Sequence, residues 1–225
     1  MSYVAGDYFG TTDSDLSTLD VVESIDTAAA LGKGDTITDD GSDDIIFGGQ
    51  GNDVIDAGAG QNIVFGDHGR IRGVDTGANT PVGDPTKTDD DYQVQVLGLV
   101  MSIDVGDANG PANSTGNGDD VIQTGIGRDM VFGGGGSDAI NSFASDGGVA
   151  AADGGNIVFG DHGMVDYLAQ ELLRSNVLNP QRTQDMDRVW SLATSMGGDD
   201  QITTGDRPDI VIGGQDRDTA ITDKT

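Results

Sequence analysis

The sequence predicts an all-β fold, a parallel β-roll (β-solenoid) built from stacked nine-residue units. Two segments match the pattern G-G-x-G-x-D-x-U-x, in which U is a large aliphatic residue: GGQGNDVID at 48–56 and GGGGSDAIN at 133–141. The phase of these units continues in steps of nine on both sides and reappears near residue 200. Of the 39 acidic residues 37 are Asp, the acid that tolerates tight turns.

The register of the repeat is kept at two positions of the unit. Eleven of twelve eighth positions are aliphatic and β-branched: Ile37, Ile46, Ile55, Val64, Ile122, Val131, Ile140, Val149, Val158, Ile202 and Val211. Nine of twelve sixth positions are aspartate: Asp35, Asp44, Asp53, Asp120, Asp129, Asp138, Asp200, Asp209 and Asp218. A disordered glycine-rich linker has no reason to hold this phase, so the pattern favours a solenoid.

Each unit divides into a glycine-rich turn and a short strand. The strand buries one aliphatic side chain only when another coil stacks on it, about 4.8 Å away. Two units make a coil of eighteen residues, which predicts that Asp35 lies over Asp53 and Asp120 over Asp138. Carboxylates stacked in this way repel one another unless a cation lies between them. Carboxylate and carbonyl oxygens are hard ligands, which suit Ca²⁺ better than Zn²⁺ or copper.

These units resemble the repeats-in-toxin (RTX, haemolysin-type) calcium-binding family, of the kind found in large bacterial surface adhesins, over a little under half of the chain. The resemblance implies several Ca²⁺ ions between successive turns, held by turn carbonyls and by the nine sixth-position aspartates. Three sixth positions depart from the pattern: Asn62 and Asn156 are weaker ligands, and Gly147 has no ligand. Asp216 replaces the fourth-position glycine of the last unit, so we expect weaker sites in the third block.

The charge excludes several classes of partner. A formal net charge of −28 argues against nucleic acid and anionic membranes as direct partners, and it predicts that the metal-free chain is expanded by self-repulsion.

The chain has no cysteine, no apolar run long enough to span a membrane and no N-terminal secretory signal. No catalytic motif such as H-E-x-x-H or G-x-S-x-G occurs, so we expect no enzyme activity.

The repeats fall into three blocks separated by excursions. We expect the end of a preceding repeat and a lead-in strand in residues 1–29, the first block in 30–69, and an excursion with a strand in 70–114. The second block follows in 115–163, an excursion with a short helix and a strand in 164–194, and an incomplete third block in 195–225. An insertion at 142–150 keeps Val149 in phase and is interpreted as an extra half-coil. We expect the excursions to fold back against the roll or to contact a neighbour.

Blocks one and two close on nearly the same sequence, VFGDHG, which contains both histidines. His68 and His162 are interpreted as polar turn residues, with metal ligation beside Asp67 and Asp161 as the alternative. The chain begins on what resembles the end of a repeat and stops without a third VFGDHG. This suggests a window from a longer array, or a subunit that associates end-to-end with further copies.

The predicted function is that of a non-enzymatic, extracellular, calcium-stabilised structural module of a bacterial surface adhesin, fibre or filament, exported without an N-terminal signal peptide. One alternative is the export and folding scaffold of a secreted toxin or hydrolase. A second is a binding module whose excursions use Tyr92, Tyr167 and Trp190. The target of the array, the number of ions and the continuity of the roll across the three blocks are left open by the sequence.

Overall fold

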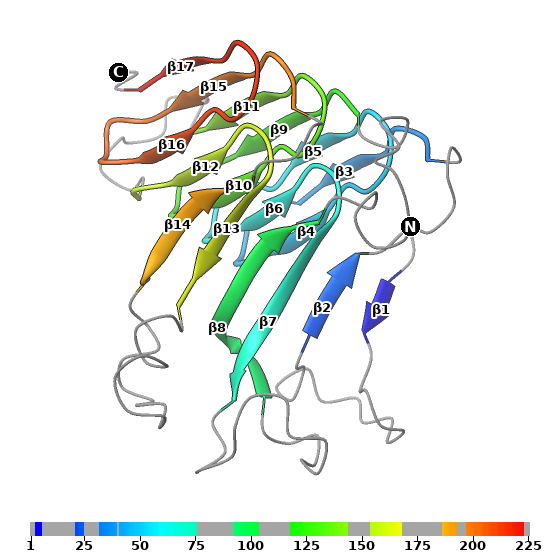
Figure 1. The fold of residues 1–225 in the computed structure, drawn as a ribbon, viewed down its shortest axis with the longest axis vertical. Helices are drawn as coiled ribbons and strands as arrows, with labels where there is room; N and C mark the ends of the chain where they lie inside the picture. Colours follow the sequence, from blue (N-terminus) through cyan, green and yellow to red (C-terminus); the bar gives the residue numbers. More distant parts are fainter. Residues whose placement is uncertain are drawn as a thin grey trace.

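The computed structural model describes residues 3–5, 21–24, 32–39, 41–75, 92–103, 118–143, 154–167, 186–192 and 197–222. All regular elements in these segments are β-strands. The described residues contain no helix long and apolar enough to cross a membrane. The protein is therefore all-β, as predicted. The strands form two parallel sheets, which make the roll, and one antiparallel sheet beside it (Figure 1).

The two parallel sheets are the two walls of the roll. The outer parallel sheet has the order β17-β15-β11-β9-β5-β3, and its strands are β3 (Thr36–Thr38), β5 (Val54–Asp56), β9 (Val121–Thr124), β11 (Ala139–Ser142), β15 (Gln201–Thr204) and β17 (Thr219–Ile221). The middle parallel sheet has the order β16-β12-β10-β6-β4, and its strands are β4 (Ile45–Phe47), β6 (Ile63–Phe65), β10 (Met130–Phe132), β12 (Ile157–Phe159) and β16 (Ile210–Ile212).

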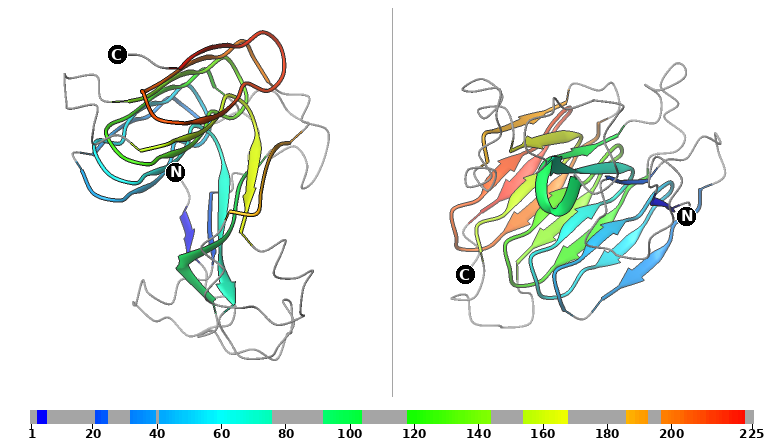
Figure 2. Two further views of the ribbon diagram at one scale, coloured as in Figure 1. Left: turned by 90° about the vertical axis from the view of Figure 1, so that its left-hand side faces the viewer. Right: turned by 90° about the horizontal axis from the view of Figure 1, so that it is seen from below.

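The three blocks form one continuous roll. Strand β5 of the first block pairs with β9 of the second, with Ile55 opposite Ile122. Strand β11 of the second block pairs with β15 of the third, with Ile140 opposite Ile202. The middle sheet crosses the same two boundaries through the pairs β6–β10 and β12–β16. Figure 2 shows the coils stacked without a gap between the blocks.

The eighth-position residues fill the space between the two parallel sheets. The core there consists of Ile46, Ile55, Ala57, Val64, Ile122, Val131, Ile140, Val158 and Ile202, with Ile37 and Val211 partly buried against it. β-Branched side chains suit this narrow space because they are stiff and pack well between pleated strands. Ala220 is the twelfth eighth-position residue and the only one that is neither Ile nor Val. It lies on the exposed end strand β17.

The extra half-coil predicted at 142–150 falls mostly outside the described residues, which include only Ser142 and Phe143 of it. Among the described strands, β10 pairs directly with β12, and β11 pairs directly with both β9 and β15, so no further strand lies between the members of these pairs.

The antiparallel sheet is formed by strands of the N-terminal segment and of the two excursions. Its order is β1-β2-β7-β8-β13-β14, and its strands are β1 (Tyr3–Ala5), β2 (Val21–Ser24), β7 (Gly69–Asp75), β8 (Tyr92–Ser102), β13 (Gly163–Asp166) and β14 (Arg188–Ser191). Three antiparallel pairs, β1–β2, β7–β8 and β13–β14, therefore lie side by side. The sheet projects away from the roll (Figure 2). The helix predicted around Leu168 and Leu172 falls outside the described residues.

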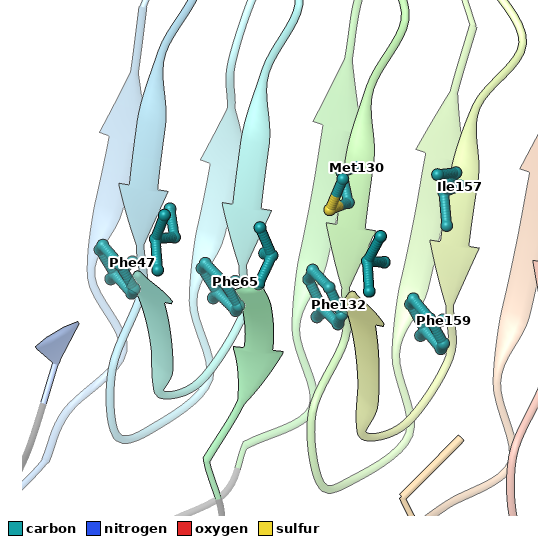
Figure 3. Close-up of a cluster of buried hydrophobic side chains, with 9 residues drawn as sticks. Phe47, Phe65, Met130, Phe132, Ile157 and Phe159 are labelled. Atoms are coloured by element: carbon teal, nitrogen blue, oxygen red, sulfur yellow. The ribbon is translucent and has the colours of Figure 1, made fainter. Parts of the chain in front are cut away.

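A column of stacked phenylalanines joins the roll to the antiparallel sheet (Figure 3). Phe47, Phe65, Phe132 and Phe159 stack with 4.8 Å between neighbouring ring centroids. Ile71, Val100 and Val165 of the antiparallel sheet are fully buried in the same cluster. The described strands of the excursions thus pack against the roll, as expected, through the parts that lie nearest to it.

Candidate metal centre

The roll has two edges of turns, and one of them carries the excursions. Turns that lead from the middle sheet to the outer sheet form what we call the insertion edge; those that lead back form the far edge. At the insertion edge the turns 48–53, 133–138 and 213–218 are intact. They alternate with split turns, in which the chain leaves the roll at Gly66 or Gly160 and returns at Gly118 or Gly197.

Six of the nine predicted aspartates form one column along the insertion edge: Asp35, Asp53, Asp120, Asp138, Asp200 and Asp218. Each carboxylate after that of Asp35 uses Oδ1 to accept a hydrogen bond from the backbone N–H of the preceding aspartate in the column. The N···O distances are 2.6 Å for Asp35 to Asp53, 2.8 Å for Asp53 to Asp120 and 2.8 Å for Asp120 to Asp138. The predicted stacking of residues eighteen apart is confirmed.

The second oxygen of these carboxylates is buried and has no hydrogen-bonding partner. This holds for Oδ2 of Asp53, Asp120, Asp138 and Asp200, whose residues are at most 2 % exposed. Leaving a buried carboxylate oxygen unpaired is costly, so each one marks a place where a cation could bind.

A glycine of the turn makes room for each unpaired oxygen. A Cβ placed on Gly133 would lie 2.3 Å from Oδ2 of Asp138 and 2.0 Å from the carbonyl oxygen of Gly160. A Cβ on Gly66 would lie 2.2 Å from Oδ2 of Asp120 and 2.3 Å from the carbonyl oxygen of Gly133. The same arrangement occurs at Gly48 and Gly160. A carboxylate oxygen and a carbonyl oxygen therefore converge at each rung.

Burial makes the charged form of these carboxyl groups unfavourable. It raises the pKa of Asp53 to about 6 and that of Asp200 to about 7. In the centre of the column burial, together with the charges of neighbouring aspartates, raises the pKa of Asp120 to about 8 and that of Asp138 to about 9. At neutral pH the central carboxyls need either a proton or a cation.

The far edge holds the other three predicted aspartates in alternation with asparagine: Asp44, Asn62, Asp129, Asn156 and Asp209. The backbone hydrogen bonds run along this column as they do at the insertion edge, with 2.9 Å from Asn62 N to Asp129 Oδ1 and 2.8 Å from Asn156 N to Asp209 Oδ1. The nine predicted aspartates thus fall into two columns, one wholly acidic and one interrupted.

The sequence analysis named Asp67 and Asp161 only as neighbours of the histidines and did not count them among the nine aspartate ligands; both stand where the chain leaves the roll at a split turn. Asp67 is 2 % exposed, and its Oδ2 accepts a hydrogen bond of 2.7 Å from the backbone N–H of Gly135 in the next turn. Asp161 accepts hydrogen bonds from Gly198, on the returning chain, and from Gln215 in the next turn. The repetition of GDHG before both excursions was the signal for this role.

Asp67 and Asp161 also add acid to the insertion edge. Burial raises the pKa of Asp67 well above its usual range, and the charge of Asp120 raises it further. Burial raises the pKa of Asp161 to about 6. Each split turn therefore holds two buried carboxyl groups, whereas an intact turn holds at most one.

The histidines lie where the antiparallel strand pairs meet the roll. His68 is 3 % exposed, and its Nδ1 lies 2.7 Å from Oγ of Ser24 in the neighbouring strand pair. The carbonyl oxygens of His68 and His162 accept hydrogen bonds from Ile103 and Leu192, just after β8 and β14. These contacts support the interpretation of both histidines as turn residues that close a block.

The donor set fits Ca²⁺. The described residues contain no group of three or more His, Cys, Asp or Glu side chains arranged around one point. A hard cation here would be held by one or two carboxylates together with turn carbonyl oxygens, which is the ligand chemistry of Ca²⁺. The last intact turn departs from the others, because Asp216 adopts a φ of 64° where Gly51 and Gly136 have 108° and 109°.

Fold and site together define a β-roll that binds metal ions through its turns. Comparison with family models agrees: the RTX calcium-binding nonapeptide repeat (4 copies) matches residues 25–69, 114–142 and 194–223. These segments are RTX calcium-binding repeats, and the chain is an RTX-type repeat protein that binds several Ca²⁺ ions. No curated protein and no solved structure matches the chain.

The raised pKa values predict how pH acts on the metal-free protein. In the unfolded chain an aspartate titrates near 3.9, whereas Asp120 and Asp138 titrate at about 8 and about 9 in the fold. Between these limits the folded state binds more protons than the unfolded state, so the free energy of unfolding falls as pH rises. We expect calcium-free protein to show more β-structure at pH 5 than at pH 8.5, measured by far-UV circular dichroism.

Saturating Ca²⁺ is the control for this titration, because a bound cation takes the place of the proton and should abolish the dependence above pH 5. A metal-free β-signal that grows as pH rises from 5 to 8.5 would contradict the assignment of these carboxyls as buried acids.

Proposed function

We propose that the chain is a non-enzymatic structural module of a large bacterial surface protein, an adhesin, fibre or filament, and that it folds when Ca²⁺ binds outside the cell. The observation that carries this proposal is the column of buried carboxylates at the insertion edge. Each has one oxygen on a neighbouring backbone and one oxygen that no protein group satisfies.

The proposed ligands are the nine sixth-position aspartates, with turn carbonyls completing each site. The central insertion-edge residues Asp53, Asp120, Asp138 and Asp200 are the best placed, because they are buried and next to a converging carbonyl oxygen. Asp35 at one end of the column is exposed, and Asp218 at the other end is half-buried. We therefore expect the end sites to be weaker, in agreement with the expectation for the third block.

Calcium would act as a switch between an exportable and a folded chain. With a net charge of −28, the metal-free chain is expanded by self-repulsion. Extracellular modules bind Ca²⁺ with dissociation constants of about 10⁻⁴–10⁻³ M, so such sites would be empty inside a cell and filled outside it. The free energy of binding then becomes free energy of folding.

Two observations favour a structural spacer over the alternatives. The excursions build a separate sheet on the roll, whereas an export scaffold needs only uninterrupted nonapeptides. Of the aromatic residues considered for a binding face, Tyr167 packs against the phenylalanine column, and Trp190 lies 4.4 Å beneath the guanidinium of Arg188. Neither is presented as an open aromatic platform.

The substitution Asp138→Ala tests the assignment of the ligands. It removes a carboxylate from the middle of the column and should raise the Ca²⁺ concentration needed for folding, measured by circular dichroism during a calcium titration. A site filled at 100 times its dissociation constant contributes about 2.7 kcal/mol, which is the loss expected at saturation. Asp53→Ala should act in the same direction.

The matched control is Asp119→Ala, which removes an exposed carboxylate from the adjacent rung. It should leave the calcium midpoint nearly unchanged. Equal effects of Asp138→Ala and Asp119→Ala would mean that only general charge matters, and the ligand assignment would then fail.

We further propose that another coil covers each end of the roll, from an adjoining repeat or from a second copy. The end strands of the middle sheet expose Ile45 and Ile210, which are 43 % and 39 % exposed, whereas Met130 and Ile157 at the same register position of the inner strands are buried. Ile221 on the end strand β17 of the outer sheet is 48 % exposed. The antiparallel sheet ends on β14, which occupies the same place in its strand pair as β8 does: Ser191 of β14 pairs with Gly163, and Ser102 of β8 pairs with Gly69. Strand β8 also pairs with β13 of the next excursion, so β14 is suited to pair with a strand of a further excursion.

Light scattering in excess Ca²⁺ tests association between copies. End-to-end assembly should raise the molar mass and should shield Trp190, the single tryptophan, from a soluble quencher. The variant Ile221→Lys, at the exposed end of the roll, should weaken assembly and leave the circular dichroism spectrum unchanged. A compact monomer at all concentrations would exclude the second copy and leave only continuation within a longer array.

A further inference from the structure

The two asparagines of the far edge differ from the aspartates in what their second side-chain atom does. We infer that Asn62 and Asn156 form calcium-free rungs, in which the side-chain amide takes the place of the cation. This inference rests on the proposed role of the aspartates as Ca²⁺ ligands. It goes beyond that role, because it assigns rungs of the same roll that hold together without an ion.

The first side-chain atom of each asparagine does what an aspartate does. Oδ1 of Asn62 accepts a hydrogen bond of 3.1 Å from the backbone N–H of Asp44, and Oδ1 of Asn156 accepts one of 2.9 Å from that of Asp129. Because a backbone N–H requires an acceptor, this contact fixes which end of the amide is oxygen. The other end is therefore an NH₂ group.

That NH₂ group donates to a carbonyl oxygen at the start of the same turn. Nδ2 of Asn62 lies 3.3 Å from the carbonyl oxygen of Gly58, and Nδ2 of Asn156 lies 2.9 Å from that of Ser142. The next rung, Asp209, shows the contrast within one edge. Its Oδ1 accepts a hydrogen bond from Asn156, while its Oδ2 is buried without a partner.

The chemistry of the two side chains explains the difference. A carboxylate has only acceptor oxygens, so its second oxygen cannot bond a carbonyl and is left for a cation. An amide presents an N–H donor in that position of the side chain and bonds a carbonyl directly. A positively polarised N–H also repels a cation, so Ca²⁺ is not needed at these rungs.

The alternation also separates the charges of the far edge. Neutral side chains stand between Asp44, Asp129 and Asp209, whereas the insertion edge stacks six acids without interruption. Dependence on calcium is therefore concentrated at the edge where the chain leaves and re-enters the roll. The far edge is held mainly by hydrogen bonds that do not involve an ion.

The test counts the ions that are linked to folding. Near saturation, the slope of the unfolding free energy against ln[Ca²⁺], divided by RT, equals the number of Ca²⁺ ions released on unfolding. We expect Asn156→Ala to lower stability by the same amount at every Ca²⁺ concentration and to leave this slope unchanged. Asp138→Ala, the matched loss of a carboxylate, should lower the slope by about one ion.

A second variant avoids the loss of packing that Asn156→Ala causes, because it keeps a side chain of the same size. Asn156→Asp replaces the donor with an unpaired oxygen, so it should convert the rung into a calcium site and raise the slope by about one. Asn62→Asp should do the same at the rung of Gly58.

The outcomes separate this inference from the proposed function. A slope near zero for the unaltered protein would overturn the proposed function itself. A slope of several ions that falls by one in Asn156→Ala, or that stays unchanged in Asn156→Asp, would overturn the calcium-free rungs alone.

Discussion

The structure depends on a buried carboxylate that serves two neighbours at once. In Asp138, Oδ1 accepts the backbone N–H of Asp120 and so fixes the spacing of the coils, while Oδ2 is left without a protein donor beside a glycine of the turn. The first oxygen makes the stack possible, and the second makes it depend on a cation. Burying an unpaired charge costs more than a single rung gains from one aliphatic side chain. The need for Ca²⁺ thus follows from the same group that sets the register.

Insertions are tolerated because alternate turns of one edge are split without breaking the stack. Asp67 and Asp161 stand at the points where the chain leaves the roll, and their carboxylates bond the backbone of the next turn. The strand pairs that leave there align into one antiparallel sheet, anchored by the phenylalanine column. The split turns are also where the most buried acid accumulates. Calcium at this edge would therefore stabilise the roll and the base of the projecting sheet together, which suits a rigid, extended module.

Periodicity was sufficient to predict the roll, its core and the stacking of aspartates within each block, because the positions of Ile55 and Asp53 follow from stacking alone. It did not decide whether the columns continue from block to block, since phase alone does not show which strands pair across a split turn. The antiparallel sheet could be foreseen only as separate strands, because the pairing of β2 with β7 and of β8 with β13 depends on coils far apart in sequence. The roles of Asp67, Asn62 and Asn156 needed the partners of individual side-chain atoms, which no spacing reveals.

An anomalous difference map from crystals grown in Ca²⁺ tests the central claim most directly. We expect a line of calcium peaks along the insertion edge, each next to Oδ2 of an aspartate between Asp53 and Asp200 and next to a turn carbonyl oxygen. No peak should lie beside the amides of Asn62 and Asn156. An ordered roll with no calcium beside these carboxylates, or with calcium bound only to exposed aspartates, would contradict the account.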